Sequence, residues 1–244
     1  MAEQKIALVT GGSRGIGAAI SKQLARDGFT VIVNYAGNAE AADHVVQEIE
    51  SSGGKAQAIQ ADIADAQAVR QLFDTLETQW GRIDVLVNNA GIMKLAPLAQ
   101  MEENAVDAQI DTNLKGSINT MREAANRLRD GGRIINLSTS VVGLKLETYA
   151  VYAATKAAVE TLTAILAKEL RGRSITVNAV APGPTATDLF LEGKSDELVE
   201  RMAKMPPLER LGQPDDIASV VAFLASPEGG WINGQTLRAN GGIV

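Results

Sequence analysis

A tyrosine and a lysine four positions apart, Tyr152 and Lys156, are the residues of this sequence best suited to move a proton. They begin an Ala-rich segment that predicts a long helix, where residues four apart point from the same face. The phenol of an unperturbed tyrosine titrates near ~10, too high for easy acid–base work at neutral pH. An ammonium group beside it favours the phenolate and lowers that pKa. The pair is therefore a candidate for proton exchange with a reacting oxygen.

A glycine-rich turn near the start of the chain is suited to bind a phosphate. It runs from Thr10 to Gly17, between a predicted strand and a predicted helix. Glycine permits positive φ and close backbone approach, and a helix N-terminus offers free N–H groups to a pyrophosphate. Its position directly after a strand and before a helix favours a dinucleotide site over a ligand-free tight turn.

Alternating strands and helices would position these motifs. We predict strands over 5–9, 30–34, 56–60, 83–87, 133–137 and 175–180, and helices over 16–27, 39–52, 66–80, about 103–128 and 151–170. Continuous apolar strands separated by helices are typical of a parallel sheet covered on both faces. Right-handed crossovers then give a doubly wound α/β fold of Rossmann type. Ligands in such folds bind at the carboxyl ends of the strands.

Length and composition predict one globular domain over residues 1–244, with 45% hydrophobic and 21% charged residues. The stretch of about 184–212, rich in proline, would form a substrate lid over the carboxyl ends of the strands. A net charge of −6 without a basic stripe argues against a nucleic-acid partner. There is no cysteine and no acidic ligand spacing, so no metal is expected. No membrane span is predicted, and a cytoplasmic location is the default.

These motifs, in this order, resemble those of the short-chain dehydrogenase/reductase family, and the resemblance covers essentially the whole chain. The glycine spacing is Gly11-x-x-x-Gly15-x-Gly17 rather than the G-x-G-x-x-G of most dinucleotide folds. The end of the sequence is similar to the branch of trihydroxynaphthalene reductases and 3-oxoacyl-carrier-protein reductases. Residues 231–242 resemble the family's seventh strand and its closing turn. The resemblance implies an oxidoreductase with a nicotinamide cofactor, commonly assembled as a homotetramer.

Two residues favour NADP(H) over NAD(H). An acidic residue at the end of the second strand usually accepts hydrogen bonds from the adenosine ribose and would repel a 2′-phosphate. Here that strand ends in the neutral Asn34, and Arg14 in the glycine turn can place a cation near the phosphate. Ser13 and Asn38 are weaker candidates for the same phosphate.

The expected cofactor contacts come from the turns that follow the strands. The glycine turn contributes Gly11, Ser13, Arg14, Gly15, Ile16 and Gly17, and the second strand ends in Asn34, Tyr35 and Ala36. By resemblance, Asp62 and Ile63 contact the adenine, and Asn89, Ala90 and Gly91 lie along the cofactor. By the same resemblance, Pro182, Gly183, Thr185 and Thr187 anchor its carboxamide and phosphates, with Tyr152 and Lys156 completing the set.

The resemblance also implies a hydroxyl group after the fifth strand that holds the substrate carbonyl. Ser138, Thr139 and Ser140 precede Tyr152 by 14, 13 and 12 residues. The family's usual gap selects Thr139, although its hydroxyl is normally that of a serine. Some naphthol-reductase relatives use the longer gap, which selects Ser138, and the Val-Val-Gly that follows Ser140 resembles the segment after the catalytic serine. We favour Ser138 and keep Ser140 as the alternative.

Asn113 matches the family's fourth catalytic residue, which would hold a water that links Lys156 to solvent. The predicted reaction is hydride transfer to a carbonyl carbon, with Tyr152 donating the proton and the hydroxyl stabilising the oxygen. An NAD-dependent alcohol dehydrogenase and a catalytically silent dinucleotide sensor are the alternatives. Arg14 and Asn34 argue against the first, and the intact Tyr152 and Lys156 argue against the second. Thioesters, naphthols or quinones, and small diketones all remain open as substrates.

Overall fold

The seven strands within residues 4–244 form one parallel sheet in the order β3-β2-β1-β4-β5-β6-β7. The computed structural model describes residues 4–244, so the first three residues of the expected domain lie outside it. Strands β1 to β7 span Ile6–Val9, Thr30–Tyr35, Lys55–Gln60, Val85–Asn88, Arg133–Leu137, Thr176–Pro182 and Thr236–Ala239. The order reverses between β1 and β4, which neighbour each other although two strands separate them in the sequence. The predicted doubly wound fold is confirmed.

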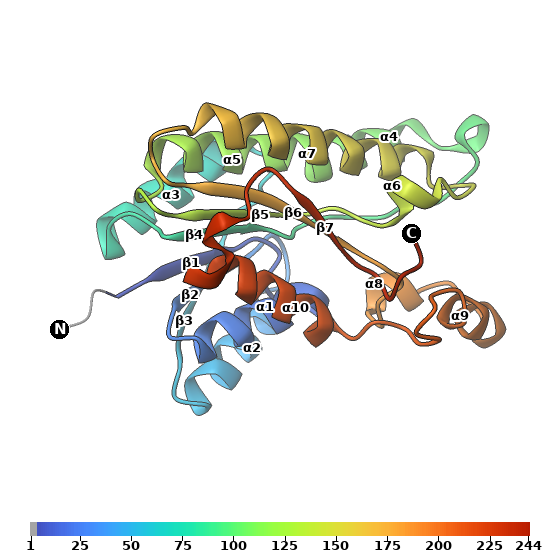
Figure 1. Ribbon diagram of the computed structural model, residues 1–244, viewed down its shortest axis with the longest axis horizontal. Helices are drawn as coiled ribbons and strands as arrows, with labels where there is room; N and C mark the ends of the chain where they lie inside the picture. Colours follow the sequence, from blue (N-terminus) through green and yellow to red (C-terminus); the bar gives the residue numbers. More distant parts are fainter. Residues whose placement is uncertain (1–3) are drawn as a thin grey trace.

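Helices cover both faces of the sheet (Figure 1). One layer contains α1 (Gly15–Arg26), α2 (Ala39–Ser51) and α10 (Pro214–Ala225), and the other contains α3 (Ala66–Trp80), α5 (Gly116–Arg127) and α7 (Ala150–Glu169). Side chains of a strand alternate between its two faces. Val9 and Val33 therefore pack with the first layer, whereas Leu8 and Ile32 pack with the second. The central strand β1 is buried on both faces, which explains why its residues are continuously apolar, whereas the edge strand β3 carries polar residues and is only partly buried.

The helix expected over about 103–128 is interrupted. It consists of α4 (Glu103–Gln109), a π-helical turn η2 (Ile110–Lys115) and α5. The turn buries the side chain of Asn113 completely, and the amide of that residue exchanges two hydrogen bonds of 2.8 Å with the backbone of Ile92. A π turn inside a helix is frequent at functional sites. The hydrophobic pattern of the sequence predicted one continuous helix, because a single π-helical turn changes that pattern too little to be recognised.

The segment after β6 extends beyond the carboxyl ends of the strands (Figure 1). It contains the short helices α8 (Asp188–Leu191) and α9 (Asp196–Ala203), neither of which has a buried residue. Three further short elements are η1 (Leu98–Gln100), α6 (Val141–Leu144) and η3 (Pro227–Trp231). The shortage of buried residues indicates that this segment is held less tightly than the sheet and its covering helices.

A buried polar network ties the second helical layer to the middle of the sheet. The side chain of Asn136 on β5 accepts a hydrogen bond of 2.8 Å from Asn88 on β4 and donates one of 2.8 Å to Thr163 on α7. Thr120 on α5 donates to Asn88 at 2.6 Å. Asn136, Thr120 and Thr163 are almost completely buried, and Asn88 is buried as well. Because water does not reach these groups, each depends on its partner.

Replacing Asn136 by alanine should lower the free energy of unfolding by about 2 kcal/mol, because the Asn88 amide loses its acceptor in a buried place. Urea unfolding at a fixed protein concentration measures the change. The matched control is Asn126→Ala on α5, an exposed asparagine whose side chain bonds only to Arg122 O. That variant should stay within about 0.5 kcal/mol of wild type. Equal losses in the two variants would contradict a stabilising role for the network.

Candidate active site

A cavity of about 570 Å³ opens at the carboxyl ends of the strands. This volume lies within the ~300–1,000 Å³ range of small-molecule sites. Every residue expected from the sequence to contact the cofactor lines it, together with Asn38, Ser138, Thr139 and Ser140. Asn113 does not line the cavity but lies directly behind it. The turns after six strands thus meet in one place, although they are spread over most of the chain.

The glycine turn shapes one end of this cavity. Gly11 and Gly15 adopt positive φ values of 59° and 51°. A Cβ atom on Gly17 would lie 2.2 Å from the carbonyl oxygen of Gly11, so only glycine fits there. Helix α1 begins at Gly15, and no side chain caps it. Its first N–H groups are therefore suited to an anion, and this cradle fits a pyrophosphate.

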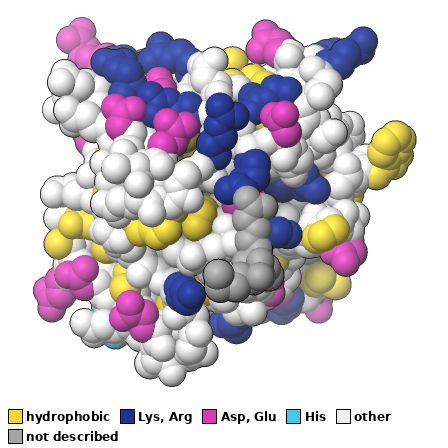
Figure 2. Space-filling view, turned by 90° about the vertical axis from the view of Figure 1, so that its left-hand side faces the viewer, with side chains coloured by type: hydrophobic (Ala, Val, Ile, Leu, Met, Phe, Trp, Pro, Cys, Tyr) yellow, Lys and Arg dark blue, Asp and Glu magenta, His cyan; other side chains and the backbone are white. Residues whose placement is uncertain are grey.

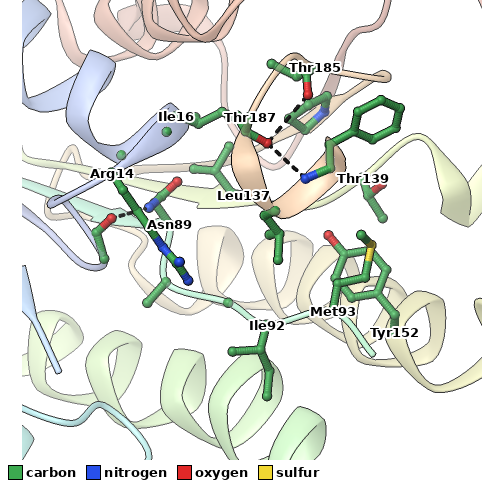
Figure 3. Close-up of a pocket in the computed structure, with 18 of the residues that line it drawn as sticks. Arg14, Ile16, Asn89, Ile92, Met93, Leu137, Thr139, Tyr152, Thr185 and Thr187 are labelled. Atoms are coloured by element: carbon green, nitrogen blue, oxygen red, sulfur yellow. Dashed lines mark hydrogen bonds between the residues drawn. The ribbon is translucent and has the colours of Figure 1, made fainter. Parts of the chain in front are cut away.

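Arg14 and Asn34 occupy the part of the cavity beside the glycine turn. The Arg14 side chain is exposed and extends into the cavity (Figure 3). Asn34 is buried, and its amide group donates to the carbonyl oxygens of Ile59 and Ala61 at 3.3 and 3.0 Å. A carboxylate at this position would face two carbonyl oxygens. Asn34 thus contributes a neutral wall, and Arg14 is the cation available to a phosphate.

The three hydroxyls after β5 point in different directions. Ser138 donates to Glu160 on α7 at 2.5 Å, whereas the hydroxyl of Ser140 donates to Ala181 O at 3.2 Å and accepts from Asn240 at 2.9 Å. The hydroxyl of Thr139 accepts from Val141 N at 3.3 Å and is the one of the three that interacts with the Tyr152 phenol, whose pKa it lowers. Figure 3 shows Thr139 and Tyr152 close together.

The structure places all three hydroxyl residues at the cavity. The hydroxyl of Ser138, the favoured candidate, and that of the alternative Ser140 are hydrogen-bonded to other groups. The usual family gap selects Thr139, the residue that interacts with Tyr152, and the Val-Val-Gly motif after Ser140 contributes α6. Which hydroxyl holds the substrate stays a prediction.

Burial controls the proton affinities of Tyr152 and Lys156. Burial raises the pKa of Tyr152 to about 12, against a smaller lowering from the hydrogen bond with Thr139. Burial also lowers the pKa of Lys156 to about 8. The Lys156 ammonium lies 6.0 Å from the centre of the Tyr152 ring and donates to Leu137 O at 2.8 Å. The expected lowering of the Tyr152 pKa by the lysine is not seen, because burial is the largest influence on this phenol.

Asn113 positions the wall of the cavity near Lys156. A Cβ atom on Gly91 would lie 3.2 Å from Asn113 Oδ1 and 3.5 Å from the Lys156 nitrogen. The Asn113 amide group donates to Ile92 O and, at 3.4 Å, to Thr155. Both polar atoms of the side chain are therefore engaged by protein groups. The structure shows Asn113 fixing the backbone after β4, and its expected role as a water holder stays a prediction.

Sequence reasoning missed three residues at this site. Tyr149 packs edge-on against Tyr152, with ring centres 6.4 Å apart, and lines the cavity. Glu160 follows Lys156 by four positions, a spacing that places it on the same helix face. Ile243 lines the cavity from the far end of the chain, and no local pattern marks it. Of the apolar residues in the expected lid segment, Leu189, Phe190, Met202 and Met205 line the cavity, whereas Leu191 and Leu198 do not.

The region is a site for organic ligands. Among residues 4–244, no group of three or more His, Cys, Asp or Glu side chains could hold a metal ion. Ile92, Met93, Leu144, Leu146 and Met205 add apolar surface around Tyr152. A small number of polar groups in an otherwise apolar cleft is typical of a specific ligand site.

Known proteins resemble this chain over nearly its whole length. The family model described as enoyl-(acyl carrier protein) reductase matches residues 11–244. A short-chain type dehydrogenase/reductase of Picea abies is 48% identical, covering 98% of this chain and 92% of that protein. A 3-oxoacyl-(acyl-carrier-protein) reductase of Staphylococcus aureus is 49% identical, covering 98% of each.

Solved structures agree with these relatives. A short-chain dehydrogenase of Burkholderia cenocepacia in complex with NADP superimposes with a TM-score of 0.92 at 42% identity, covering 99% of this chain and 98% of that one. The angucycline C-6 ketoreductase LanV with bound NADP gives a TM-score of 0.92 at 35% identity, covering 98% and 95%. The fold and the sequence therefore point to one family.

The buried lysine should make stability depend on pH. The folded pKa of Lys156 is about 8, against 10.5 for the free side chain, so above pH 8 the unfolded chain binds a proton that the folded chain does not. The free energy of unfolding of wild type, relative to Lys156→Met, should therefore rise between pH 8 and 9.5, by up to about 1 kcal/mol per pH unit. Tyr152 has the opposite effect, but only above pH 10.

Urea titrations at pH 7.5, 8.5 and 9.5 measure this dependence. The control is Lys168→Met, which removes an exposed lysine from the same helix and should leave the wild-type dependence unchanged. Parallel curves for wild type and Lys156→Met would contradict a depressed pKa at Lys156.

Proposed function

The chain belongs to the short-chain dehydrogenase/reductase family, and from this we propose that it reduces a carbonyl compound to an alcohol with NADPH. It is an NADP-dependent enzyme of that family, since relatives of similar sequence and structure bind NADP. The observation that carries the proposal is the single cavity that unites the glycine turn, Arg14 and the Thr139–Tyr152 pair. The reverse oxidation uses the same groups.

The residues present fit an NADP(H) molecule. We propose that the uncapped start of α1 and the glycine turn bind the pyrophosphate and that Arg14 pairs with the 2′-phosphate. Asp62 and Ile63 would lie against the adenine, and the turn after β6 would hold the nicotinamide end. Thr187 caps α8 through Phe190 N, as Figure 3 shows, and its hydroxyl lies near Thr185 O. When bound, the cofactor supplies the hydride.

Tyr152 is the proposed proton donor. Its raised pKa keeps the hydroxyl protonated at neutral pH, so a proton is present when the substrate oxygen becomes basic. Thr139, which interacts with the same hydroxyl, would donate a hydrogen bond to that oxygen and stabilise its developing charge. Lys156, held by Leu137 O, would favour the phenolate left after proton transfer. Asn113 would act indirectly, by fixing the segment beside Lys156.

The substrate is proposed to be a neutral, partly apolar carbonyl compound. Phe190, Met202 and Met205 approach the cavity from the segment of about 184–212, which we propose as the lid of a single catalytic domain. Methionine side chains adapt to many shapes and so accept a range of substituents. Its relatives include a 3-oxoacyl-(acyl-carrier-protein) reductase and an angucycline ketoreductase, so thioesters, quinones and diketones are the classes of carbonyl compound to compare.

We propose a homotetramer in solution. Helix α7 is apolar and long enough to cross a membrane by length and composition, yet its residues Thr155, Val159 and Thr163 are buried in the fold. Its exposed Ile165, together with Trp231 at 99% exposure, leaves apolar surface suited to further copies of the chain.

Figure 2 shows basic and acidic side chains side by side on one face, a pattern unlike that of nucleic-acid binders. The cytoplasmic location stays a prediction.

Tyr152→Phe should lower kcat by about 10²- to 10⁴-fold, because it removes the proton donor and keeps the ring. NADPH consumption with a panel of diketones, quinones and 3-oxoacyl thioesters measures this.

Thr139→Val should lower kcat by about 10²-fold or more, because it removes the hydroxyl group, whereas Thr139→Ser should retain most of the activity. The matched comparison is Ser138→Ala, expected within about tenfold of wild type because its hydroxyl serves Glu160. A severe loss in Ser138→Ala with a mild one in Thr139→Val would reverse the assignment.

Arg14→Ala should raise the KM for NADPH by about 10- to 100-fold, the worth of a charge-assisted hydrogen bond, and leave the KM for NADH nearly unchanged. Steady-state kinetics with each cofactor give the two values. Arg26→Ala, an exposed arginine at the other end of α1, is the control. If both KM values rose together in Arg14→Ala, the residue would shape the turn and would not recognise the 2′-phosphate.

A further inference from the structure

The last five residues form a tight turn that reaches the active site. Gly241 and Gly242 adopt positive φ values of 65° and 88°, and Ile243 N donates to Asn240 O at 3.4 Å. The Asn240 side chain accepts from Gly242 N at 2.9 Å and donates to Val244 O at 3.3 Å. The Asn240 side chain thus holds the two ends of the turn together through these hydrogen bonds. Asn240 is itself buried, so the sequence interval 240–244 is an ordered part of the fold.

This 240–244 turn is bonded to the segment that carries the substrate-holding hydroxyl. Asn240 donates to the hydroxyl of Ser140, the neighbour of Thr139, at 2.9 Å. A Cβ atom on Gly143 would lie 2.8 Å from Val244 Cγ2, so the Val244 side chain rests on the Gly143 backbone. One side of the turn is therefore fixed to the start of α6.

The opposite side of the turn contacts the end of the lid. Leu208 N donates to Gly241 O at 3.4 Å. Cβ atoms on Gly241 and Gly242 would lie 3.0 Å from Pro206 and 3.2 Å from Pro207. The turn is thus wedged between the catalytic segment and the lid, and Ile243 is the one residue of 240–244 that lines the cavity.

We propose that Ile243 is a specificity-determining residue, whose side chain limits the size of the substituent on the substrate carbonyl. The inference rests on the proposed carbonyl reduction. Ile243 shares the cavity with Val141 and Leu144 from the catalytic segment and Met205 from the lid. Methionine can move aside for a larger group, whereas the β-branched Ile243 is stiff, and its backbone is held by Asn240. Because Ile243 is the residue of this cavity wall that cannot move aside, it determines the largest substituent that fits.

The first test compares a small and a bulky ketone. The kcat/KM values for butane-2,3-dione and 1-phenylpropane-1,2-dione with NADPH are measured in wild type, Ile243→Ala and Ile243→Trp. The ratio of the bulky to the small substrate should rise about tenfold in Ile243→Ala and fall about tenfold in Ile243→Trp, as expected for a change in pocket volume. The affinity for NADPH, followed by its fluorescence, should change less than twofold. Ratios within twofold of wild type in both variants would overturn the proposal.

A second test needs no turnover. The chain has no cysteine, so Ile243→Cys introduces a unique thiol, and the control is Arg238→Cys at the one exposed residue of β7. Alkylation by iodoacetamide is compared with alkylation by the larger N-(1-pyrenyl)maleimide. The preference for the small reagent should be about tenfold greater at position 243 than at 238, and equal preferences would overturn the placement of Ile243. Wild type that reduces no ketone would instead refute the proposed function, and the thiol result would still decide whether Ile243 forms the wall.

Discussion

The strands of the sheet all run in one direction, and this constraint determines where polar groups can gather. Both faces of the sheet are covered by helices, so the strands themselves carry apolar side chains. The polar and glycine residues that line the cavity therefore lie mostly at the strand ends and in the turns that follow them, and these turns share one edge. Because the strand order reverses between β1 and β4, the helices that follow them diverge and leave a cavity at that edge. The site is a consequence of this topology.

Such a cavity is useful only if the surrounding helices hold their places. The asparagine and threonine network between β4, β5, α5 and α7 ties the catalytic helix to the sheet through directed bonds. Asn113 performs a similar task for the backbone after β4 and requires a π turn to reach it. Apolar contacts alone would let a helix slide along the sheet, whereas buried hydrogen bonds form in only one position of the helix relative to the strands. Tyr152 and Lys156 thus lie on a helix that is held in place by buried side chains outside the cavity.

The features predictable from the sequence were those encoded by contiguous residues. The glycine turn reflects a backbone conformation that only glycine adopts easily. The Tyr152–Lys156 spacing and the strand–helix alternation reflect the periodicity of helices and strands. The identity of the hydroxyl at Tyr152 was different, because three neighbours offered the same group and only the register at the end of β5 separates them. The pKa of Tyr152 also depends on burial, which spacing does not reveal. Ile243 required knowledge of where the chain returns after β7.

A threonine at position 139 is physically reasonable in a place where a serine would be expected. Its hydroxyl offers the same donor and acceptor capacity. Its second substituent on Cβ restricts χ1, so fewer rotamers compete with the one that faces Tyr152. The neighbouring hydroxyls of Ser138 and Ser140 are fixed by Glu160 and Asn240, which keeps them from competing for the phenol. Three successive hydroxyls thus have different partners, and the stiffest of the three side chains is the one that interacts with the Tyr152 phenol.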